Sequence, residues 1–274
     1  MIIDRRRSVG SPQRCSGYVP KWLRERTEFD DSAIFQEVIG IRIVGEDGTS
    51  RDVPAPGYIL DRTRFDKTLA IRALESGADL ANALVLKRNG MRVVGRRNGI
   101  EAEFSGEYIL GADGPNSVIG KSLGQVQNRY LATMQFEVGL CTPEEWVEFY
   151  RSSAEEEGLA WFVPCGRTAQ IGVGVVRSQA KYLKARLSGF LNRLHTEGRI
   201  YGEGVLGCTG GLVPLANGSC TIQKGAILLA GDAGGISEPF SGVGIATAVV
   251  SGEVAGDLIG QAFSEGSSDV LRGY

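Results

Sequence analysis

Apolar and polar positions alternate along much of the first part of the chain, which is the pattern of strands with one buried face. Residues 38–44 and 57–60 form two such runs on either side of a Glu-Asp-Gly turn. Further short runs at 79–110 are separated by Asn-Gly pairs at 89–90 and 98–99, a pair that favours tight hairpin turns. The pattern therefore predicts a hairpin followed later by a β-meander.

From Asp61 the apolar spacing changes to that of a helix. Phe65, Leu69 and Leu74 fall on one face of this predicted helix, and Asp61 or Thr63 is suited to cap its first turn. Farther along, the pattern predicts a separate layer of structure at 126–207. It contains predicted strands at 132–140, 159–163 and 170–176, and predicted helices near 144–156 and 179–195.

Near the end of the chain, a buried strand at 226–230 is predicted to run into Gly231 and Asp232. A glycine-rich turn with Gly242 and Gly244 then opens a helix around Val243. In α/β folds this arrangement brings a carboxylate and a helix N-terminus to the carboxyl edge of a sheet. The carboxylate can bind polyol hydroxyls, and the helix dipole favours an electron-rich ring that gains negative charge. A flavin needs both, although an ordinary strand–turn–helix is the alternative.

Composition narrows the class of protein. The 274 residues carry a net charge of −2, which implies no basic surface for nucleic acid. No apolar run reaches the roughly 20 residues of a membrane span, and the N-terminus does not resemble a secretory leader. Five scattered cysteines without a Cys-x-x-Cys pair argue against disulfides and zinc and for the cytoplasm. With His195 as the one histidine, a Ser-His-Asp hydrolase is not expected.

Several short motifs follow one another in a fixed order. They are Met1-Ile-Ile-Asp4-Arg5, Pro12-Gln-Arg-Cys15-Ser16-Gly17, Arg62-Thr-Arg-Phe65-Asp66, Ala112-Asp113-Gly114 with Ser117, Leu159-Ala-Trp161-Phe-Val-Pro164 with Gly172-Val-Gly174, and the Gly231-Asp232 turn. Together, over nearly the whole chain, they resemble the motifs of the geranylgeranyl reductase family. The resemblance implies an α/β fold of the hydroxybenzoate-hydroxylase type, with a Rossmann-like FAD-binding domain and a substrate domain made of an antiparallel β-sheet plus helices.

The resemblance also implies roles for individual residues. Asp4 is expected to bind the adenosine ribose, Asp232 the ribityl chain, and Cys15 to act in catalysis. The full set of expected FAD-binding residues is Asp4, Arg5, Cys15, Ser16, Arg62, Ala112, Asp113, Asp232, Gly242, Gly244 and Ile245. For Cys15 a packed loop residue, and for Asp113 a plain Asp-Gly turn, are the structural alternatives. Arg6 and Arg7 are expected to be solvated.

Trp161 and Pro164 are expected to line the isoprenoid pocket. Leu159 and Val163 depart from the aromatic residues of the family signature but remain apolar. The expected FAD-binding domain comprises 1–33, 58–125 and 208–274, and the expected substrate domain comprises 34–57 and 126–207.

A complete family member begins with a further strand and a Gly-x-Gly-x-x-Gly turn that cradles the FAD pyrophosphate. No such turn occurs in this sequence, and the C-terminal helical region of the family is also missing. These departures predict a product truncated at both ends, a misplaced start codon or a split gene. The loss of a central strand is expected to expose apolar faces and unpaired backbone groups.

The resemblance implies reduction of C=C bonds in a polyprenyl (geranylgeranyl) lipid or diphosphate by reduced FAD, with NADPH or ferredoxin as the electron donor. Peripheral contact with a membrane is a further hypothesis, because prenyl substrates reside in bilayers. The alternatives are a flavin monooxygenase or a prenyl-quinone reductase on the same scaffold, and a non-catalytic flavoprotein remnant. The sequence does not contain the Trp-x-Trp-x-Ile signature of a halogenase.

Overall fold

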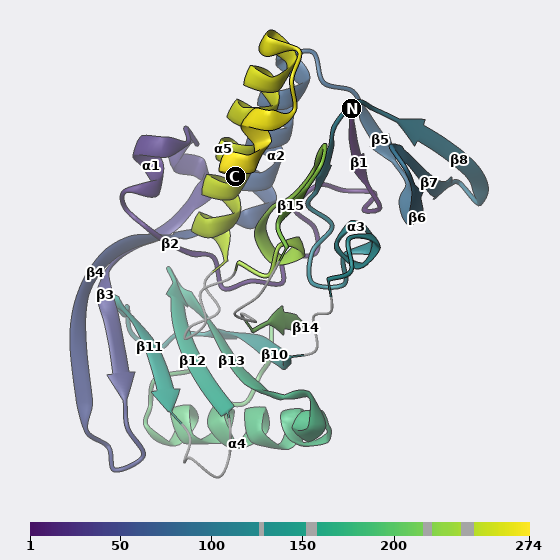
Figure 1. Cartoon of the computed structure of the whole chain (residues 1–274). Coiled ribbons are helices and arrows are strands. Elements are labelled where there is room, and N and C mark those ends of the chain that lie inside the picture. Colours follow the sequence, from purple (N-terminus) through teal and green to yellow (C-terminus); the bar gives the residue numbers. More distant parts are fainter. Residues whose placement is uncertain (126–128, 152–157, 216–220, 237–243) are drawn as a thin grey trace. The chain divides into compact units, whose positions relative to one another are not determined.

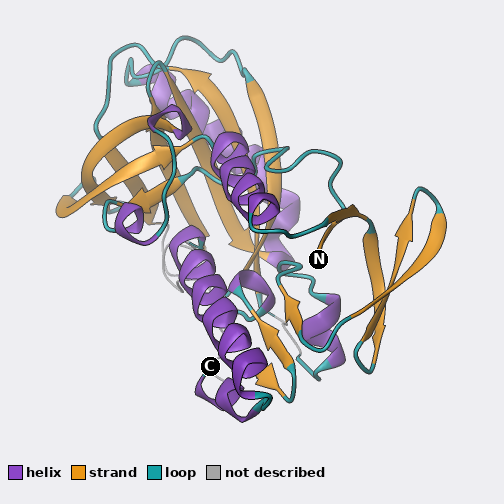
Figure 2. Ribbon diagram, turned by 90° about the horizontal axis from the view of Figure 1, so that it is seen from above, coloured by secondary structure: helices purple, strands orange, loops and turns teal. Residues whose placement is uncertain are grey.

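The computed structural model describes residues 1–125, 129–151, 158–215, 221–236 and 244–274 (Figures 1 and 2). The chain forms two compact units. Unit 1 comprises Met1–Val9, Lys67–Asn128 and Pro214–Tyr274, and unit 2 comprises Gly10–Asp66 and Arg129–Val213. Residues 10–33 and 58–66, which the sequence assigned to the cofactor domain, thus fold within unit 2. The functional assignment of the two domains remains a prediction.

Unit 2 is built on one eight-stranded sheet with the strand order β14-β10-β13-β12-β11-β3-β4-β2. The strands are β2 (Tyr18–Pro20), β3 (Ile34–Val44), β4 (Ser50–Leu60), β10 (Tyr130–Gly139), β11 (Trp146–Arg151), β12 (Gly158–Cys165), β13 (Thr168–Val176) and β14 (Gly207–Pro214). The predicted hairpin is present as β3 and β4, and both strands are longer than the apolar runs alone indicated. In its turn, the Asp47 carboxylate accepts the Thr49 N–H at 3.0 Å.

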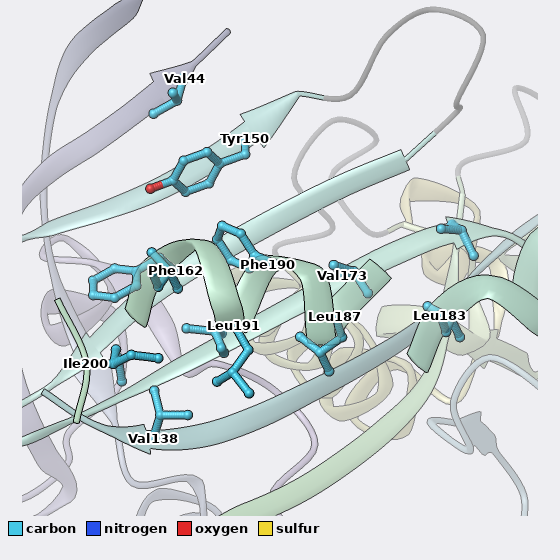
Figure 3. Packing of buried hydrophobic residues seen from close by; sticks show 14 of the residues in the cluster. Val44, Val138, Tyr150, Phe162, Val173, Leu183, Leu187, Phe190, Leu191 and Ile200 are labelled. Atoms are coloured by element: carbon cyan, nitrogen blue, oxygen red, sulfur yellow. The ribbon is translucent and has the colours of Figure 1, made fainter. Parts of the chain in front are cut away.

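One face of this sheet is covered by α4 (Leu183–Thr196), which follows a 3₁₀ turn at Arg177–Tyr182. The apolar stripe of α4 is buried as the 3.6-residue period requires, and it packs on side chains of β10, β12 and β13 (Figure 3). Tyr150 and Phe190 meet edge to face, with ring centroids 4.9 Å apart. Burial of each side chain of this size contributes roughly 1.5–3 kcal/mol, so this layer forms a hydrophobic core of unit 2. The helix predicted at 179–195 and the strands predicted around it are confirmed.

The helix predicted near 144–156 is wrong in its described part, because residues 146–151 form the strand β11. β11 pairs in parallel with β3 and antiparallel with β12, so that its backbone groups are satisfied on both edges. From its local sequence this segment was predicted to be helical. Pairing across the sheet overrides that local preference.

Within its described residues, unit 1 contains three small sheets. A parallel pair joins β1 (Ile2–Asp4) to β5 (Leu80–Asn82), and β6 (Leu84–Asn89), β7 (Arg92–Arg97) and β8 (Ile100–Ser105) form an antiparallel meander. The third sheet has the order β15 (Gln223–Lys224), β16 (Ile227–Leu229) and β9 (Ile109–Gly111). The predicted meander is confirmed, and its second turn has Asn98 and Gly99 at φ of 50° and 83°, as a tight primed turn requires.

The described α-helices that lie wholly in unit 1 are α3 (Val118–Ser122) and α5 (Ile245–Glu265), the latter followed by a 3₁₀ turn at Asp269–Gly273. Leu228 of β16, Ala255 and Ala262 of α5 and Leu271 form a buried cluster. Alanines on this face of α5 allow the helix to lie close to the sheet.

Helix α2 (Arg62–Glu75) contains the boundary between the two units, and the short helix α1 (Leu23–Arg26) belongs to unit 2. Asp61 is the capping residue of α2, since its carboxylate accepts the N–H groups of Thr63 at 2.9 Å and Arg64 at 3.2 Å. Phe65 is buried as predicted, but Leu74 is exposed. No described helix is long and apolar enough to span a bilayer.

Candidate cofactor site and comparison with known proteins

Two predicted site carboxylates lie at one edge of a sheet in unit 1. β9 and β16 are parallel, with Gly111 opposite Leu229, and the Ala230 N–H donates to the Gly111 carbonyl at 2.9 Å. Asp113 follows the end of β9 and Asp232 follows the end of β16. Because the carboxyl ends of parallel strands meet at the same edge, the structure brings the two turns together where α/β folds hold ligands.

The turn before Asp232 is shaped by Gly231, which has a φ of 54°. Its N–H donates to the Ser251 hydroxyl of α5 at 3.0 Å, and a Cβ on Gly231 would lie 3.1 Å from the Ala248 Cβ. The turn and the first half of α5 are therefore in direct contact. The helix begins at Ile245, close to the start predicted around residue 243, and Gly244 is its N-cap. Its first turn presents backbone N–H groups without helical acceptors. Gly242 lies outside the described residues.

The Asp113 carboxylate forms hydrogen bonds with the residues that follow its own turn. Its carboxylate accepts hydrogen bonds from the Ser117 hydroxyl and from the N–H groups of Val118 at 2.6 Å and Ile119 at 3.3 Å. Ser117 in turn caps α3 by accepting the Gly120 N–H at 2.7 Å. This arrangement favours the Asp-Gly turn over a direct cofactor contact for Asp113, and the adjacent Ala112 is exposed.

Asp4 ends β1 and belongs to the same unit as Asp232. Its carboxylate accepts the Arg6 N–H at 2.9 Å, and its carbonyl accepts the N–H of Ala83 at 3.0 Å. The strand end is thereby fixed with the acidic side chain half-buried, while Arg5 is exposed. This is the position that the resemblance predicts for a ribose-binding acid.

Cys15, Ser16 and Arg62 lie in unit 2, where the loop at 10–17 packs on the junction of β4 and α2. The Arg62 guanidinium donates to both oxygens of Asp66, at 2.8 and 3.1 Å. Burial lowers the pKa of Arg62, and Cys15 and Asp66 raise it by more, so that its pKa lies above the ordinary value. The structure pairs the Arg62 guanidinium with Asp66, and the Arg62 backbone N–H with Gln13 of the loop that carries Cys15.

Trp161 and Pro164 lie on β12. The Trp161 indole covers Gly172 of β13, where a Cβ would overlap the ring. Its Nε1 is buried and has no hydrogen-bond partner among the described residues. Phe162, the next residue, points into the α4-side core, so Trp161 lies on the opposite face of the sheet.

The sequence did not reveal the roles of two residues near Cys15 and Arg62, namely Gln13 and Asp66. Gln13 connects the loop to the helix, since its amide donates to the Cys15 carbonyl at 3.1 Å and accepts the Arg62 N–H at 3.2 Å. Asp66 was part of a motif but had no predicted role, although its four-residue spacing from Arg62 on a helix is the signal for an ion pair.

Comparison with known proteins adds independent evidence. No protein-family model matches the chain. It is 30% identical to digeranylgeranylglycerophospholipid reductase 1 of Methanosphaera stadtmanae, over 97% of the chain and 70% of that relative. A geranylgeranyl bacteriochlorophyll reductase-like protein of Thermoplasma acidophilum is 26% identical and superposes with a TM-score of 0.88, over 100% of this chain and 75% of the other.

A flavin-dependent brominase is similar in fold alone, with a TM-score of 0.73 and 16% identity over 96% of this chain and 74% of the other. The α/β fold predicted from the motifs is thus confirmed as one that FAD-dependent oxidoreductases share. The 30% sequence identity to the Methanosphaera stadtmanae reductase shows to which family of these oxidoreductases the chain belongs. The chain belongs to the digeranylgeranylglycerophospholipid reductase family, in agreement with its motifs.

Proposed function

We propose that this protein is an FAD-dependent reductase of C=C bonds in a digeranylgeranyl glycerophospholipid or a related polyprenyl lipid. The observation that carries the proposal is the family relationship, which extends over nearly the whole chain. It is supported by the two parallel-strand ends in unit 1 that carry Asp113 and Asp232 and by the start of α5 beside them. The members of this family named above are reductases, so an enzyme of the oxidoreductase class is the expected type.

The residues present fit FAD. Carboxylates accept hydrogen bonds from ribose and ribityl hydroxyls, and Asp4 and Asp232 would hold those parts of the cofactor. The N–H groups at the start of α5, near Gly244 and Ile245, suit the ring edge that becomes electron-rich on reduction. The positive φ of Gly231 permits the close turn on which this side of the site depends.

In its reduced form, bound FAD would supply a hydride equivalent for one carbon of the alkene. The protein then has to protonate the other carbon, and the Cys15 thiol is our candidate for that proton, with replacement from water. Trp161 and Pro164 would give the prenyl chain an apolar wall and exclude water. Leu159 and Val163 keep the wall apolar where the family signature has aromatic residues.

The proposal also includes an electron donor and a contact with the membrane. The reducing equivalents would come from NADPH or a ferredoxin. The lipid would be reached by peripheral contact with the bilayer, for which the exposed apolar residues Tyr201, Val205 and Leu206 offer one surface. Flotation with lipid vesicles tests this contact, and absence of the protein from the vesicle fraction would contradict it.

The test of the main proposal is a turnover assay with the full chain, FAD, a chemical reductant and a digeranylgeranyl glycerophospholipid. We expect the lipid mass to rise by two hydrogens for each reduced double bond. A yellow, FAD-loaded protein that leaves the lipid mass unchanged would contradict the proposed reaction. Oxygen uptake coupled to NADPH oxidation would instead favour a monooxygenase, and a protein that stays colourless with added FAD would favour a non-catalytic remnant.

A further inference from the structure

The side chain of Asn82 holds the backbone turn that carries Asp4 at the end of β1. β1 and β5 pair in parallel, with Asp4 opposite Asn82. The Asn82 Nδ2 donates to the Asp4 carbonyl at 3.2 Å and also to the Arg6 carbonyl. A side-chain amide has two N–H donors, so one asparagine can satisfy both carbonyls. Asn82 therefore closes the backbone between residues 4 and 6 from the neighbouring strand.

This closure determines what the Asp4 carboxylate offers to a ligand. In the closed turn the Arg6 N–H donates to the Asp4 Oδ1 at 2.9 Å, which fixes the direction of the carboxylate. The second oxygen, Oδ2, has no hydrogen-bond partner among the described residues, and none of the arginines at 5–7 forms an ion pair with it. The Asp4 side chain is half-buried. A half-buried carboxylate with an unused acceptor oxygen suits hydroxyl groups, which donate hydrogen bonds to it.

We propose that Asn82 is a positioning residue for FAD, which fixes the Asp4 carboxylate in the orientation in which Oδ2 accepts the hydroxyls of the adenosine ribose. The inference rests on the part of the proposed function that assigns this ribose to Asp4. Without Asn82, residues 4–6 have to be ordered when the cofactor binds, and the cost of that ordering lowers the affinity. Asn82 acts through Asp4 and requires no contact of its own with FAD.

The FAD affinity, measured by fluorescence titration, tests this role without turnover. We expect Asn82→Ala, and the nearly isosteric Asn82→Asp, which lacks the N–H donors, to weaken FAD binding by about five- to tenfold. Asn89→Ala is the matched control, since Asn89 is an exposed asparagine on β6 of the same unit. It should bind FAD as the wild type does. Unchanged affinity in both Asn82 variants would overturn the proposal.

A role through Asp4 also predicts where the effect of Asn82 disappears. In an Asp4→Ala background, Asn82→Ala should change the FAD affinity by less than about twofold. An FAD analogue that carries 2′,3′-dideoxyadenosine should likewise bind to the wild type and to Asn82→Ala with affinities within about twofold of each other. A merely structural role would lower the affinity equally for both flavins and in both backgrounds, and that result would overturn the proposal.

The outcomes separate this inference from the proposed reaction. Wild-type protein that binds FAD but leaves the lipid mass unchanged would contradict the reaction, while the titrations would still decide the role of Asn82. Wild-type protein that binds FAD no more tightly than the dideoxyadenosine analogue would show that Asp4 does not bind the ribose hydroxyls. That result would overturn the role of Asn82 and leave the proposed reaction standing.

Discussion

The Arg199 guanidinium donates to the Glu148 carboxylate at 2.7 Å and to the Tyr150 hydroxyl at 2.9 Å, within the part of unit 2 that α4 covers. Tyr150 donates to the same carboxylate at 2.5 Å, and the Glu148 side chain is only 5% exposed. Arg199 also lies over the Phe162 ring, 4.1 Å from its centroid. A buried charge from β11 is thus neutralised by a residue that follows α4.

Removal of Arg199 would take away the shorter ion pair of the Glu148 carboxylate and leave its 3.4 Å contact with Arg42. We expect Arg199→Met to lower the free energy of unfolding by about 3–5 kcal/mol, measured by urea denaturation. The double variant Arg199→Met with Glu148→Leu should recover much of this loss, because neither charge then remains buried. As a control, Glu103→Gln removes an exposed pair with Arg92 and should change stability by less than about 0.5 kcal/mol. If Arg199→Met and Glu103→Gln lowered the free energy of unfolding by similar amounts, burial of the ion pair would not explain its contribution.

Tyr150 gives the protein a pH dependence at alkaline pH. Burial and the hydrogen bond with Glu148 raise its pKa above the ordinary value of about 10. The unfolded chain therefore releases this proton at a pH at which the folded protein retains it, and stability declines as the pH rises above about 10. The urea midpoint should thus fall from about pH 9 to pH 11, and less steeply in Tyr150→Phe. Identical slopes in the two proteins would show that other groups dominate.

The Trp161 indole requires a glycine at position 172. We expect Gly172→Ala to destabilise unit 2 by about 1–3 kcal/mol and to shift the tryptophan emission, because the new Cβ would displace the ring. The matched control is Gly189→Ala in α4, where an added Cβ meets nothing within 4 Å. That variant should stabilise the helix by about 0.5–1 kcal/mol. Unchanged emission in Gly172→Ala would contradict the described packing.

Asp232 is expected to contribute directly to FAD affinity. If its carboxylate accepts ribityl hydroxyls, Asp232→Ala should weaken binding by about 10- to 100-fold, since hydrogen bonds to charged groups contribute about 1.5–3 kcal/mol. Fluorescence titration of FAD measures the change. Asp257→Ala removes an exposed carboxylate of α5 and should leave the affinity as in the wild type. Equal affinities in all three proteins would remove Asp232 from the site.

Asp113 should behave differently from Asp232, because its carboxylate is engaged by the first turn of α3. We expect Asp113→Ala to lower thermal stability through the loss of a cap that contributes about 0.5–2 kcal/mol. Ser117→Ala should cause a loss of similar kind, since Ser117 caps the same helix. FAD affinity that falls in Asp113→Ala but not in Ser117→Ala would instead assign Asp113 to the cofactor.

Local sequence was sufficient for many elements of this fold. The alternation at 38–44 predicted part of the β3–β4 hairpin, and the Asn-Gly pairs predicted the turns of the meander. Asp61 predicted the start of α2, since a capping side chain acts on N–H groups within three residues of it. The order of the motifs predicted the family, because glycines and acids at strand ends are required at fixed places in such a fold.

Tertiary structure decided what depends on distant partners. Residues 146–151 are a strand because β3 and β12, far away in the sequence, satisfy both of its edges. Glu148 is buried with counter-charges from Arg199, 51 residues later, and from Arg42, 106 residues earlier. The Arg62 N–H donates to the Gln13 side chain because the loop at 10–17 packs on the end of β4. Short-range preferences determine turns and caps, whereas burial and charge compensation depend on which segments the sheet brings together.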